Sequence, residues 1–192
     1  MKLNLPNKLT LLRVIMIPLF LFFIIFPVFG DVVSPIVATV IFILTALTDM
    51  LDGKIARKYN LITNFGKFLD PLADKVMILG GLIGLLCVAN VRGEVYAKVL
   101  AWSFFLILLR ELAVTSMRLV VSDAGNIVIA ANWMGKCKTV LQTVTMVVLI
   151  LEPLVPTNNI VSYIFLAATV ILTMWSGINY FIAYWPYLDP TK

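Results

Sequence analysis

Two pairs of aspartate residues give this 192-residue chain its clearest chemical signal. Asp49 and Asp52 are three positions apart, and Asp70 and Asp74 are four positions apart. Either spacing places two side chains on the same face of a helix. If the two helices are antiparallel neighbours, the four carboxylates face one another. Carboxylates gathered in a medium of low dielectric cannot all ionise unless a cation lies between them, so the pairs predict a cation site.

Oxygen ligands alone favour hard divalent ions, so we expect Mg²⁺ or Mn²⁺ at this site. Two such ions about 3.5–4 Å apart are the arrangement that enzymes use for displacement at phosphorus. The neighbouring residues fit a phosphate-bearing ligand. Gly53 and Ala56 are small enough to leave an open face beside Asp52, and Arg57 supplies positive charge for a phosphate.

The connection between the two aspartate pairs is expected to be a loop over residues 59–70. Gly66 would provide the turn that leads the chain back to Asp70. Pro71 would occupy the first turn of the following helix, where its missing N–H costs nothing. The second pair would then lie at the start of that helix.

The rest of the chain is strongly apolar. Hydrophobic residues make up 61% of it and the mean hydropathy is +1.02, against roughly 45–50% apolar residues in a soluble domain. Long uncharged runs recur, and with their flanking residues they can span a bilayer. We therefore predict an all-α integral membrane protein, with a single domain over residues 1–192 and a short N-terminal surface helix at about residues 4–12. Six transmembrane helices are expected, at residues 12–29, 33–58, 71–91, 95–121, 133–151 and 158–185.

Basic residues are distributed unevenly between the two ends of the predicted helices. The connections 29–35 and 152–159 contain no lysine or arginine, whereas the N-terminus and the regions around the long connections 59–70 and 122–132 are basic. The positive-inside rule then places both termini and the aspartates on the cytoplasmic side of the cell membrane. This topology and an anionic inner leaflet explain the net charge of +5, so nucleic-acid binding is not expected.

The absence of histidine excludes several kinds of chemistry. This chain cannot use histidine-based general acid–base catalysis, histidine-ligated zinc or a Ser-His nucleophile. Cys87 and Cys137 fall in different predicted helices near opposite faces of the bilayer, so no disulfide is expected between them. Catalysis would therefore have to use carboxylates, cations, hydroxyls and a metal.

Two other interpretations of the aspartates remain open. A single pair beside lysine and arginine would most often be the solvated end of a helix. A divalent-cation transporter would also gather carboxylates, but its site would lie near the bilayer midplane with interrupted helices. The aspartates here are predicted at the membrane edge, beside a basic loop.

The aspartates belong to a longer pattern, D-x-x-D-G-x-x-A-R-x8-G-x3-D-x3-D, which residues 49–74 match without a substitution. The pattern resembles the signature of the CDP-alcohol phosphotransferases. Members of that family have six transmembrane helices, usually form homodimers, and transfer a phosphatidyl or similar group from a CDP-linked donor to an alcohol. The resemblance therefore implies a homodimeric membrane enzyme that uses CDP-diacylglycerol as its donor.

The resemblance also implies roles for individual residues. The four aspartates would bind two divalent ions, and Asp74 would be the general base for the acceptor hydroxyl. The binding surface for the CDP moiety would comprise Gly53, Ala56, Arg57 and Gly66. The N-terminal stretch LPNKLTLLR resembles the family's N-terminal segment. It would add three residues to the nucleotide pocket: Asn7, Thr10 and Arg13.

A basic cluster in the second half of the chain indicates an anionic acceptor. Its members lie on the cytoplasmic halves of the predicted helices 95–121 and 133–151: Arg110, Arg118, Lys136 and Lys138. Arg110 stands beside Glu111 within an apolar helix, where ionisable groups are costly and usually functional. Glycerol 3-phosphate fits, because its phosphate needs neutralising while its free hydroxyl can point at Asp74.

Positive-inside topology alone would also explain such a cluster, and a pair between Glu111 and a neighbouring cation would make part of it structural. The same block resembles the corresponding region of bacterial phosphatidylglycerophosphate synthases, as do the chain length and the WSGINY stretch at residues 175–180. The predicted function is therefore transfer of the phosphatidyl group to glycerol 3-phosphate with release of CMP. A phosphatidylinositol-phosphate synthase and a cardiolipin synthase of the CDP-alcohol type are the alternatives within the family.

Overall fold

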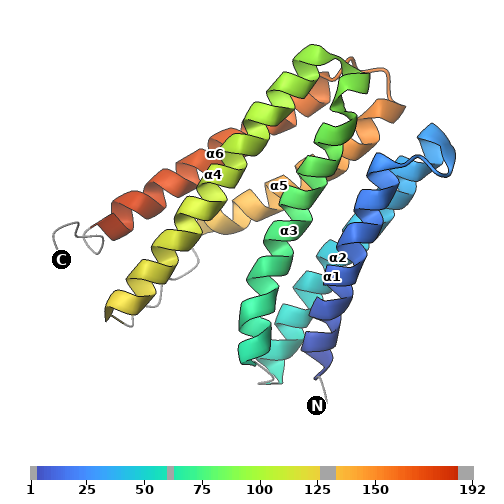
Figure 1. The fold of residues 1–192 in the computed structure, drawn as a ribbon. Helices are drawn as coiled ribbons and strands as arrows, with labels where there is room; N and C mark the ends of the chain where they lie inside the picture. Colours follow the sequence, from blue (N-terminus) through green and yellow to red (C-terminus); the bar gives the residue numbers. More distant parts are fainter. Residues whose placement is uncertain (1–3, 60–62, 126–132, 186–192) are drawn as a thin grey trace.

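The computed structural model describes residues 4–59, 63–125 and 133–185, and within these ranges all regular secondary structure is helical. The predicted all-α fold is confirmed. Figure 1 shows the long helices packed against one another as a bundle. In chain order the elements are α1 (Leu5–Ile25), α2 (Gly30–Lys58), α3 (Asn64–Val88), the 3₁₀ helix η1 (Ala89–Arg92), α4 (Glu94–Gly125), α5 (Trp133–Leu151), the 3₁₀ helix η2 (Glu152–Leu154) and α6 (Ile160–Tyr184).

Successive long helices alternate in direction (Figure 1). α1 packs against both α2 and α3, α4 lies along α6, and α5 contacts α2, α3 and α6. The beginnings of α1, α3 and α5 therefore share one end of the bundle with the ends of α2, α4 and α6. That end holds the residues predicted to be functional.

Five stretches of the described residues are long and apolar enough to cross a membrane, by length and composition. They lie in α1, in α2, in α3 with η1, in α5 with η2, and in α6. α4 corresponds to the remaining predicted span; it has 32 residues and carries Arg110 and Glu111 near its middle. With this many apolar helices, the chain is a multi-pass membrane protein.

The short surface helix predicted at about residues 4–12 does not stand apart from the first span. α1 is one continuous helix, and Asn4 caps its start by accepting a hydrogen bond from the backbone N–H of Asn7 at 3.2 Å. The prediction of a separate helix is wrong because no residue between Thr10 and Val14 breaks the helix. One face of these first turns, with Thr10 and Arg13, is buried in the bundle, whereas Leu5, Leu11 and Leu12 are exposed.

α3 begins earlier than the sequence predicted. Thr63 is its N-cap, and the threonine side chain accepts a hydrogen bond from the backbone N–H of Gly66 at 3.0 Å. Gly66 therefore lies in the first turn of α3 and Pro71 lies well inside the helix, which corrects the loop predicted over 59–70 and the first-turn position predicted for Pro71. Gly66 and Pro71 had predicted that the helix would begin only at residue 71, but the cap at Thr63 starts it before both residues. Asp70 consequently lies within the helix.

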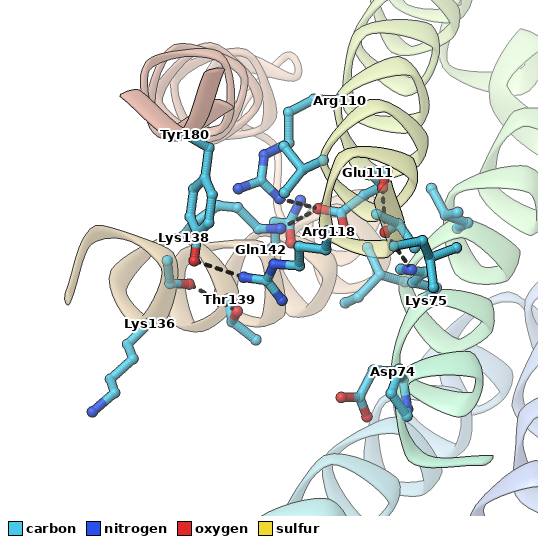
Figure 2. A pocket seen from close by; sticks show the side chains of 17 residues that line it. Asp74, Lys75, Arg110, Glu111, Arg118, Lys136, Lys138, Thr139, Gln142 and Tyr180 are labelled. Carbon is cyan, nitrogen blue, oxygen red and sulfur yellow. Dashed lines mark hydrogen bonds and ion pairs between the residues drawn. The ribbon is translucent and has the colours of Figure 1, made fainter. Parts of the chain in front are cut away.

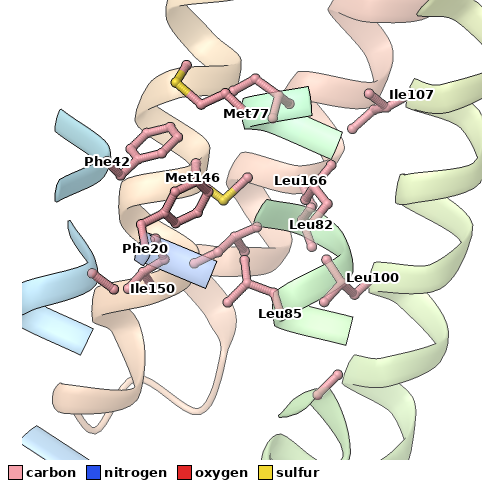
Figure 3. Close-up of a cluster of buried hydrophobic side chains, with 14 of the residues drawn as sticks. Phe20, Phe42, Met77, Leu82, Leu85, Leu100, Ile107, Met146, Ile150 and Leu166 are labelled. Atoms are coloured by element: carbon pink, nitrogen blue, oxygen red, sulfur yellow. The ribbon is translucent and has the colours of Figure 1, made fainter. Parts of the chain in front are cut away.

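An apolar core joins all six long helices (Figure 3). Each helix contributes at least one of these buried side chains: Phe20, Phe42, Leu82, Leu100, Met146 and Leu166. Two glycines of α3 allow its neighbours to approach closely, since a Cβ on Gly81 would lie 2.8 Å from Cε of Met146 and one on Gly84 would lie 2.8 Å from Cδ2 of Leu21. Helices in a bilayer associate through such close packing, because lipid is as apolar as their side chains.

A buried polar network, the Arg92–Glu152 clamp, closes the end of the bundle away from the aspartates. Arg92 pairs with Glu152 at 2.7 Å between Nη2 and Oε2. The same guanidinium donates to the hydroxyl of Tyr96 at 2.7 Å, to the backbone carbonyl of Leu149 at 3.0 Å and to Oδ1 of Asn159 at 2.8 Å. The clamp thus joins η1, α4, α5 and the start of α6.

The carboxylate of Glu152 also has several hydrogen-bond donors besides Arg92. Its carboxylate accepts hydrogen bonds from the backbone N–H groups of Val161 and Ser162, both at 2.9 Å, and from the hydroxyl of Thr157 at 2.5 Å. These are the free N–H groups of the first turn of α6, so the carboxylate caps that helix. A buried pair with this many additional hydrogen bonds offsets the cost of taking both charges out of water.

Candidate active site

The four predicted aspartates converge at one end of the bundle. α2 carries Asp49 and Asp52, and α3 carries Asp70 and Asp74. Arg13 of α1 lies among them, with Nη1 at 2.6 Å from Oδ1 of Asp49 and at 2.7 Å from Oδ1 of Asp74. Its Nη2 forms a further ion pair with Asp52. One fully buried guanidinium therefore links three carboxylates from two helices.

Thr10, one turn before Arg13, brings the fourth aspartate into the same cluster. Its hydroxyl lies 2.8 Å from Oδ1 of Asp70 and 3.3 Å from Oδ2 of Asp52, so it can donate to either carboxylate. Asn7 lies one turn earlier still, and its Oδ1 accepts a hydrogen bond from the hydroxyl of Thr63 at 3.0 Å. The inner face of α1 thus contacts the carboxylate cluster at Thr10 and Arg13, and the cap of α3 at Asn7.

The cluster carries more negative than positive charge at close range. The cluster has four carboxyl groups and one guanidinium, which pairs with three of them, and Nε of Arg13 is buried with no hydrogen-bond partner among the described residues. A donor set made only of carboxylate oxygens is the kind that a hard divalent ion prefers, so the residue types present fit such an ion. In the arrangement seen here, no three described acidic or cysteine side chains are grouped around a common ion position, and the ion pairs of Arg13 link the carboxylates instead.

The aspartates differ in their access to solvent. The side chain of Asp52 is 3% exposed and that of Asp74 is 50% exposed. Asp52 is therefore held inside the bundle, whereas Asp74 can meet a ligand.

The residues predicted to bind the CDP moiety lie on both sides of the cluster. Gly53 directly follows Asp52 in α2 and is partly buried. In the first turn of α3, a Cβ on Gly66 would lie 3.2 Å from Oδ1 of Asn7, so a larger residue would press on α1. Ala56 and Arg57 also belong to α2, but their side chains lie outside the part of the chain that the structure describes.

A cavity of about 500 Å³ opens beside Asp74 (Figure 2). α3, α4, α5 and α6 all contribute to its wall. The four basic residues predicted to bind the acceptor all line it: Arg110, Arg118, Lys136 and Lys138. The structure therefore brings the basic cluster and one carboxylate of the aspartate cluster to the same space.

The sequence of this chain also matches known proteins. The profile of the CDP-alcohol phosphatidyltransferase family matches residues 3–175. The chain belongs to that family. Its relatives include a CDP-diacylglycerol–glycerol-3-phosphate 3-phosphatidyltransferase of Bacillus subtilis (strain 168), which is 39% identical over 98% of this chain and 99% of its own length.

Two further relatives carry related names. A probable phosphatidylglycerophosphate synthase of Mycobacterium tuberculosis (strain H37Rv) is 39% identical over 92% of this chain and 79% of its own length. A CDP-diacylglycerol–glycerol-3-phosphate 3-phosphatidyltransferase of Yersinia pestis (strain Pestoides F) is 35% identical over 96% of this chain and 97% of its own length. The family resemblance that the sequence pattern indicated is confirmed.

Within the cavity of this CDP-alcohol phosphatidyltransferase, part of the basic cluster is tied to Glu111. The carboxylate pairs with Lys138 and, at 3.1 Å, with Nη1 of Arg110. Nη2 of Arg110 donates to the hydroxyl of Ser176 at 3.0 Å. The pairing left open by the sequence is therefore present, and it neutralises part of the charge of Arg110 and Lys138.

Within the part of the chain that the structure describes, no ion pair is found for the other two basic residues that were predicted to bind the acceptor. Arg118 donates through Nη2 to the hydroxyl of Tyr180 at 2.7 Å, and no described carboxylate pairs with it. Lys136 is exposed, and in Figure 2 its side chain extends away from Asp74. Arg118, which is exposed as well, therefore lines the cavity with no described carboxylate to neutralise it, and Lys136 lines the cavity but extends away from Asp74.

Several residues that line the cavity were missed by the sequence analysis. Lys75 directly follows Asp74 and donates to the hydroxyl of Thr115 at 2.5 Å. Gln142 is buried in the wall and its Nε2 has no hydrogen-bond partner among the described residues. The position of Lys75 next to the last aspartate was an available signal. Tyr180 ends the WSGINY stretch, whose resemblance was a second signal, whereas Gln142 gave none, because an amide within an apolar helix is usually a packing residue.

Proposed function

We propose that this protein is a CDP-diacylglycerol–glycerol-3-phosphate 3-phosphatidyltransferase, which transfers the phosphatidyl group of CDP-diacylglycerol to glycerol 3-phosphate and releases CMP. One observation supports this above the others. Asp74 belongs to the aspartate cluster and also lines a cavity with an unneutralised arginine. An acceptor with a phosphate at one end and a hydroxyl at the other would fit between them. The names of the relatives agree with this activity.

The aspartate cluster would hold two divalent ions, Mg²⁺ or Mn²⁺, through Asp49, Asp52, Asp70 and Asp74. When bound, such ions neutralise the charge of a pyrophosphate and favour departure of the leaving phosphate. The cytidine and its phosphates would lie against α1 and the neighbouring ends of α2 and α3. The residues proposed for this surface are Asn7, Thr10, Arg13, Gly53, Ala56, Arg57 and Gly66.

Asp74 would act as the general base. Its carboxylate would take the proton of the acceptor hydroxyl as the hydroxyl oxygen attacks the lipid-side phosphorus of CDP-diacylglycerol. A new P–O bond forms between the acceptor oxygen and the lipid-side phosphorus, and the bond from that phosphorus to the bridging oxygen breaks, so that the bridging oxygen leaves with its electron pair as part of CMP. Asp74 suits this role because its side chain is half exposed to the cavity, while Asp52 is buried.

The basic residues of the cavity would bind the acceptor phosphate. Arg118 would make the main contact, since no described carboxylate neutralises it, and Lys75 is a second candidate. Arg110 and Lys138 would add positive charge to the cavity wall, where their ion pairs with Glu111 hold them in place. Lys136 would attract the anion at the rim.

The site would face the cytoplasm, with both termini on that side, and the enzyme would work as a homodimer in the cell membrane. The positive-inside distribution of lysine and arginine supports this orientation. A lipid donor and a soluble phosphorylated acceptor can meet only where the bilayer adjoins water. An active site at one end of the helical bundle satisfies that requirement, since the product lipid stays in the bilayer and CMP leaves to the cytoplasm.

Replacing Arg118 by alanine is expected to raise the apparent KM for glycerol 3-phosphate by about 10- to 100-fold, because a charge-assisted hydrogen bond to a phosphate is worth roughly 1.5–3 kcal/mol. The KM for CDP-diacylglycerol should change by no more than about twofold. Steady-state kinetics in detergent micelles would measure both constants. Lys98→Ala is the control, because Lys98 forms an exposed pair with Glu94 at the other end of the bundle. Equal changes in both constants for Arg118→Ala would contradict an acceptor role.

The proposed activity is tested by the dependence of CMP release on both substrates. Purified protein with Mg²⁺ should release CMP only when CDP-diacylglycerol and glycerol 3-phosphate are both present, with one phosphatidylglycerophosphate formed for each CMP. A chelator of divalent ions should stop the reaction, and added Mg²⁺ or Mn²⁺ should restore it. Proteoliposomes that take up divalent ions while no condition releases CMP would instead identify a transporter.

A further inference from the structure

Two arginines of α4 that line the cavity are held by α6, the helix that carries the WSGINY stretch. Arg118 contacts Tyr180, and Arg110 contacts Ser176. Figure 1 shows α4 and α6 lying along each other, and both contacts fall on the same side of α6 because Ser176 and Tyr180 are one turn apart. Helix α6 therefore supports the basic wall of the cavity.

Tyr180 is itself rigidly placed. Its ring packs in an apolar cluster with Val114, Met117 and Val121 of α4, and the residue is 4% exposed. The phenol oxygen accepts the hydrogen bond from Nη2 of Arg118 at 2.7 Å, and the guanidinium carbon lies 4.9 Å from the ring centroid. Both the hydroxyl and the ring face thus favour one position of the guanidinium.

The hydroxyl of Tyr180 restrains Arg118 without neutralising it. A phenol is a neutral acceptor, and it uses one of the five N–H donors of a guanidinium. Among the described residues no other partner of the Arg118 guanidinium is found, so its remaining donors and its positive charge can meet an anion in the cavity. A carboxylate at the same place would hold Arg118 equally well but would compete with a phosphate.

Arg110 is fixed in a different way. Its Nη2 donates to Ser176 at 3.0 Å, and its stem passes directly over Gly177, where an added Cβ would lie 2.8 Å from Cγ of the arginine. Only glycine at position 177 leaves room for the aliphatic part of the Arg110 side chain. The guanidinium can then donate its hydrogen bond to the hydroxyl of Ser176. Ser176 and Gly177 therefore define the path of Arg110 into the cavity wall.

We propose that α6 is the positioning element of the acceptor site: Tyr180 fixes Arg118, and Ser176 with Gly177 fixes Arg110. Tyr180 acts through Arg118, so it is a positioning residue and takes no part in the chemical step. This inference rests on the proposed function, because the ligand of the cavity is taken to be a phosphorylated acceptor. It assigns to the serine, glycine and tyrosine of WSGINY a task in acceptor recognition.

The test is a double-mutant cycle of Tyr180→Phe with Arg118→Ala, using glycerol 3-phosphate as the acceptor. Tyr180→Phe keeps the ring and removes the hydroxyl, so it should raise the apparent KM for glycerol 3-phosphate by about two- to tenfold. Turnover at saturation and the KM for CDP-diacylglycerol should stay near wild type. In the Arg118→Ala background the same change should have no further effect on KM, since the residue it positions is absent.

Matched variants separate positioning from general packing. Tyr163→Phe makes the same chemical change nearer the other end of α6 and should leave both KM values unchanged. Ser176→Ala should raise the KM for glycerol 3-phosphate, whereas Ser103→Ala, whose hydroxyl bonds only within α4, should not. The proposal would be overturned if Tyr180→Phe had the wild-type KM for glycerol 3-phosphate. It would also be overturned if Tyr180→Phe raised this KM by the same factor with Arg118 present and with Arg118→Ala. Absence of glycerol 3-phosphate-dependent CMP release by the wild-type protein would instead refute the proposed function.

Discussion

Replacing Asp74 by asparagine is expected to lower turnover by about 10²–10⁴-fold, the usual contribution of a general base. Asparagine has nearly the same shape as aspartate and can still offer an oxygen to an ion, but it cannot take the proton of the acceptor hydroxyl. The fold should survive, because Arg13 keeps its ion pairs with Asp49 and Asp52. CMP release under saturating substrates is the measurement.

Asp31→Asn is the matched control for this prediction. Asp31 is exposed in the first turn of α2, at the end of the bundle away from the cluster, so its replacement should leave turnover unchanged. Stabilisation of Asp74→Asn against heat by CDP-diacylglycerol with Mg²⁺ would show that the donor still binds. Turnover within a few-fold of wild type in Asp74→Asn would rule out the general-base role.

Replacing Glu152 by alanine is expected to lower the free energy of unfolding by about 3–5 kcal/mol. The change leaves Arg92 buried without its carboxylate and removes the cap of the first turn of α6. For a chain of this size the loss corresponds to a fall in Tm of roughly 6–20 °C. Thermal unfolding in detergent, followed by the loss of helical circular dichroism, would measure it.

Glu94→Ala provides the comparison for the clamp. Glu94 pairs with Lys98 at 2.6 Å on the surface, one helical turn apart, and both side chains are more than 70% exposed. Such a pair contributes roughly 0.3–0.5 kcal/mol, so Tm should hardly change. At temperatures where Glu152→Ala remains folded, its KM for glycerol 3-phosphate should equal that of wild type, because the clamp lies far from the cavity along the bundle. Equal effects of the two glutamate variants on Tm would refute a stabilising role for the clamp.

The parts of the site that the sequence predicted are those encoded by local spacing. The pairs Asp49–Asp52 and Asp70–Asp74 each lie on one helix, and three- or four-residue spacing fixes a shared face whatever the tertiary structure. The alternating apolar and basic segments likewise predict the number and order of the helices. The convergence of the two pairs needed only the antiparallel packing of neighbouring helices.

The start of α3 shows where local rules were misleading. Gly66 and Pro71 were interpreted as a turn and a helix start, but both lie within α3, which begins after the Thr63 cap. Glycine at position 66 fits the close approach of α1, since Oδ1 of Asn7 takes the space that a side chain would need. A tertiary contact of this kind cannot be predicted from residue preferences.

The contacts that complete the site join residues far apart in the chain. Glu111 and Lys138 lie on α4 and α5, and Arg118 and Tyr180 lie on α4 and α6. The sequence indicated that these positions were charged or polar, but it contained no information on which partner each would meet. It placed Arg13 in a nucleotide pocket by resemblance, and the structure adds that its guanidinium also joins three of the four aspartates.

The central claim is that the cavity beside Asp74 accepts glycerol 3-phosphate. A competition between acceptors tests it most directly, because every rival acceptor also carries phosphate. Purified protein would receive limiting CDP-diacylglycerol, Mg²⁺ and equal concentrations of glycerol 3-phosphate, inositol phosphate and phosphatidylglycerol, and the lipid products would be identified by mass spectrometry. We predict phosphatidylglycerophosphate as the dominant product, with CMP released in equal amount. Phosphatidylinositol phosphate or cardiolipin as the main product would contradict the assignment of the acceptor.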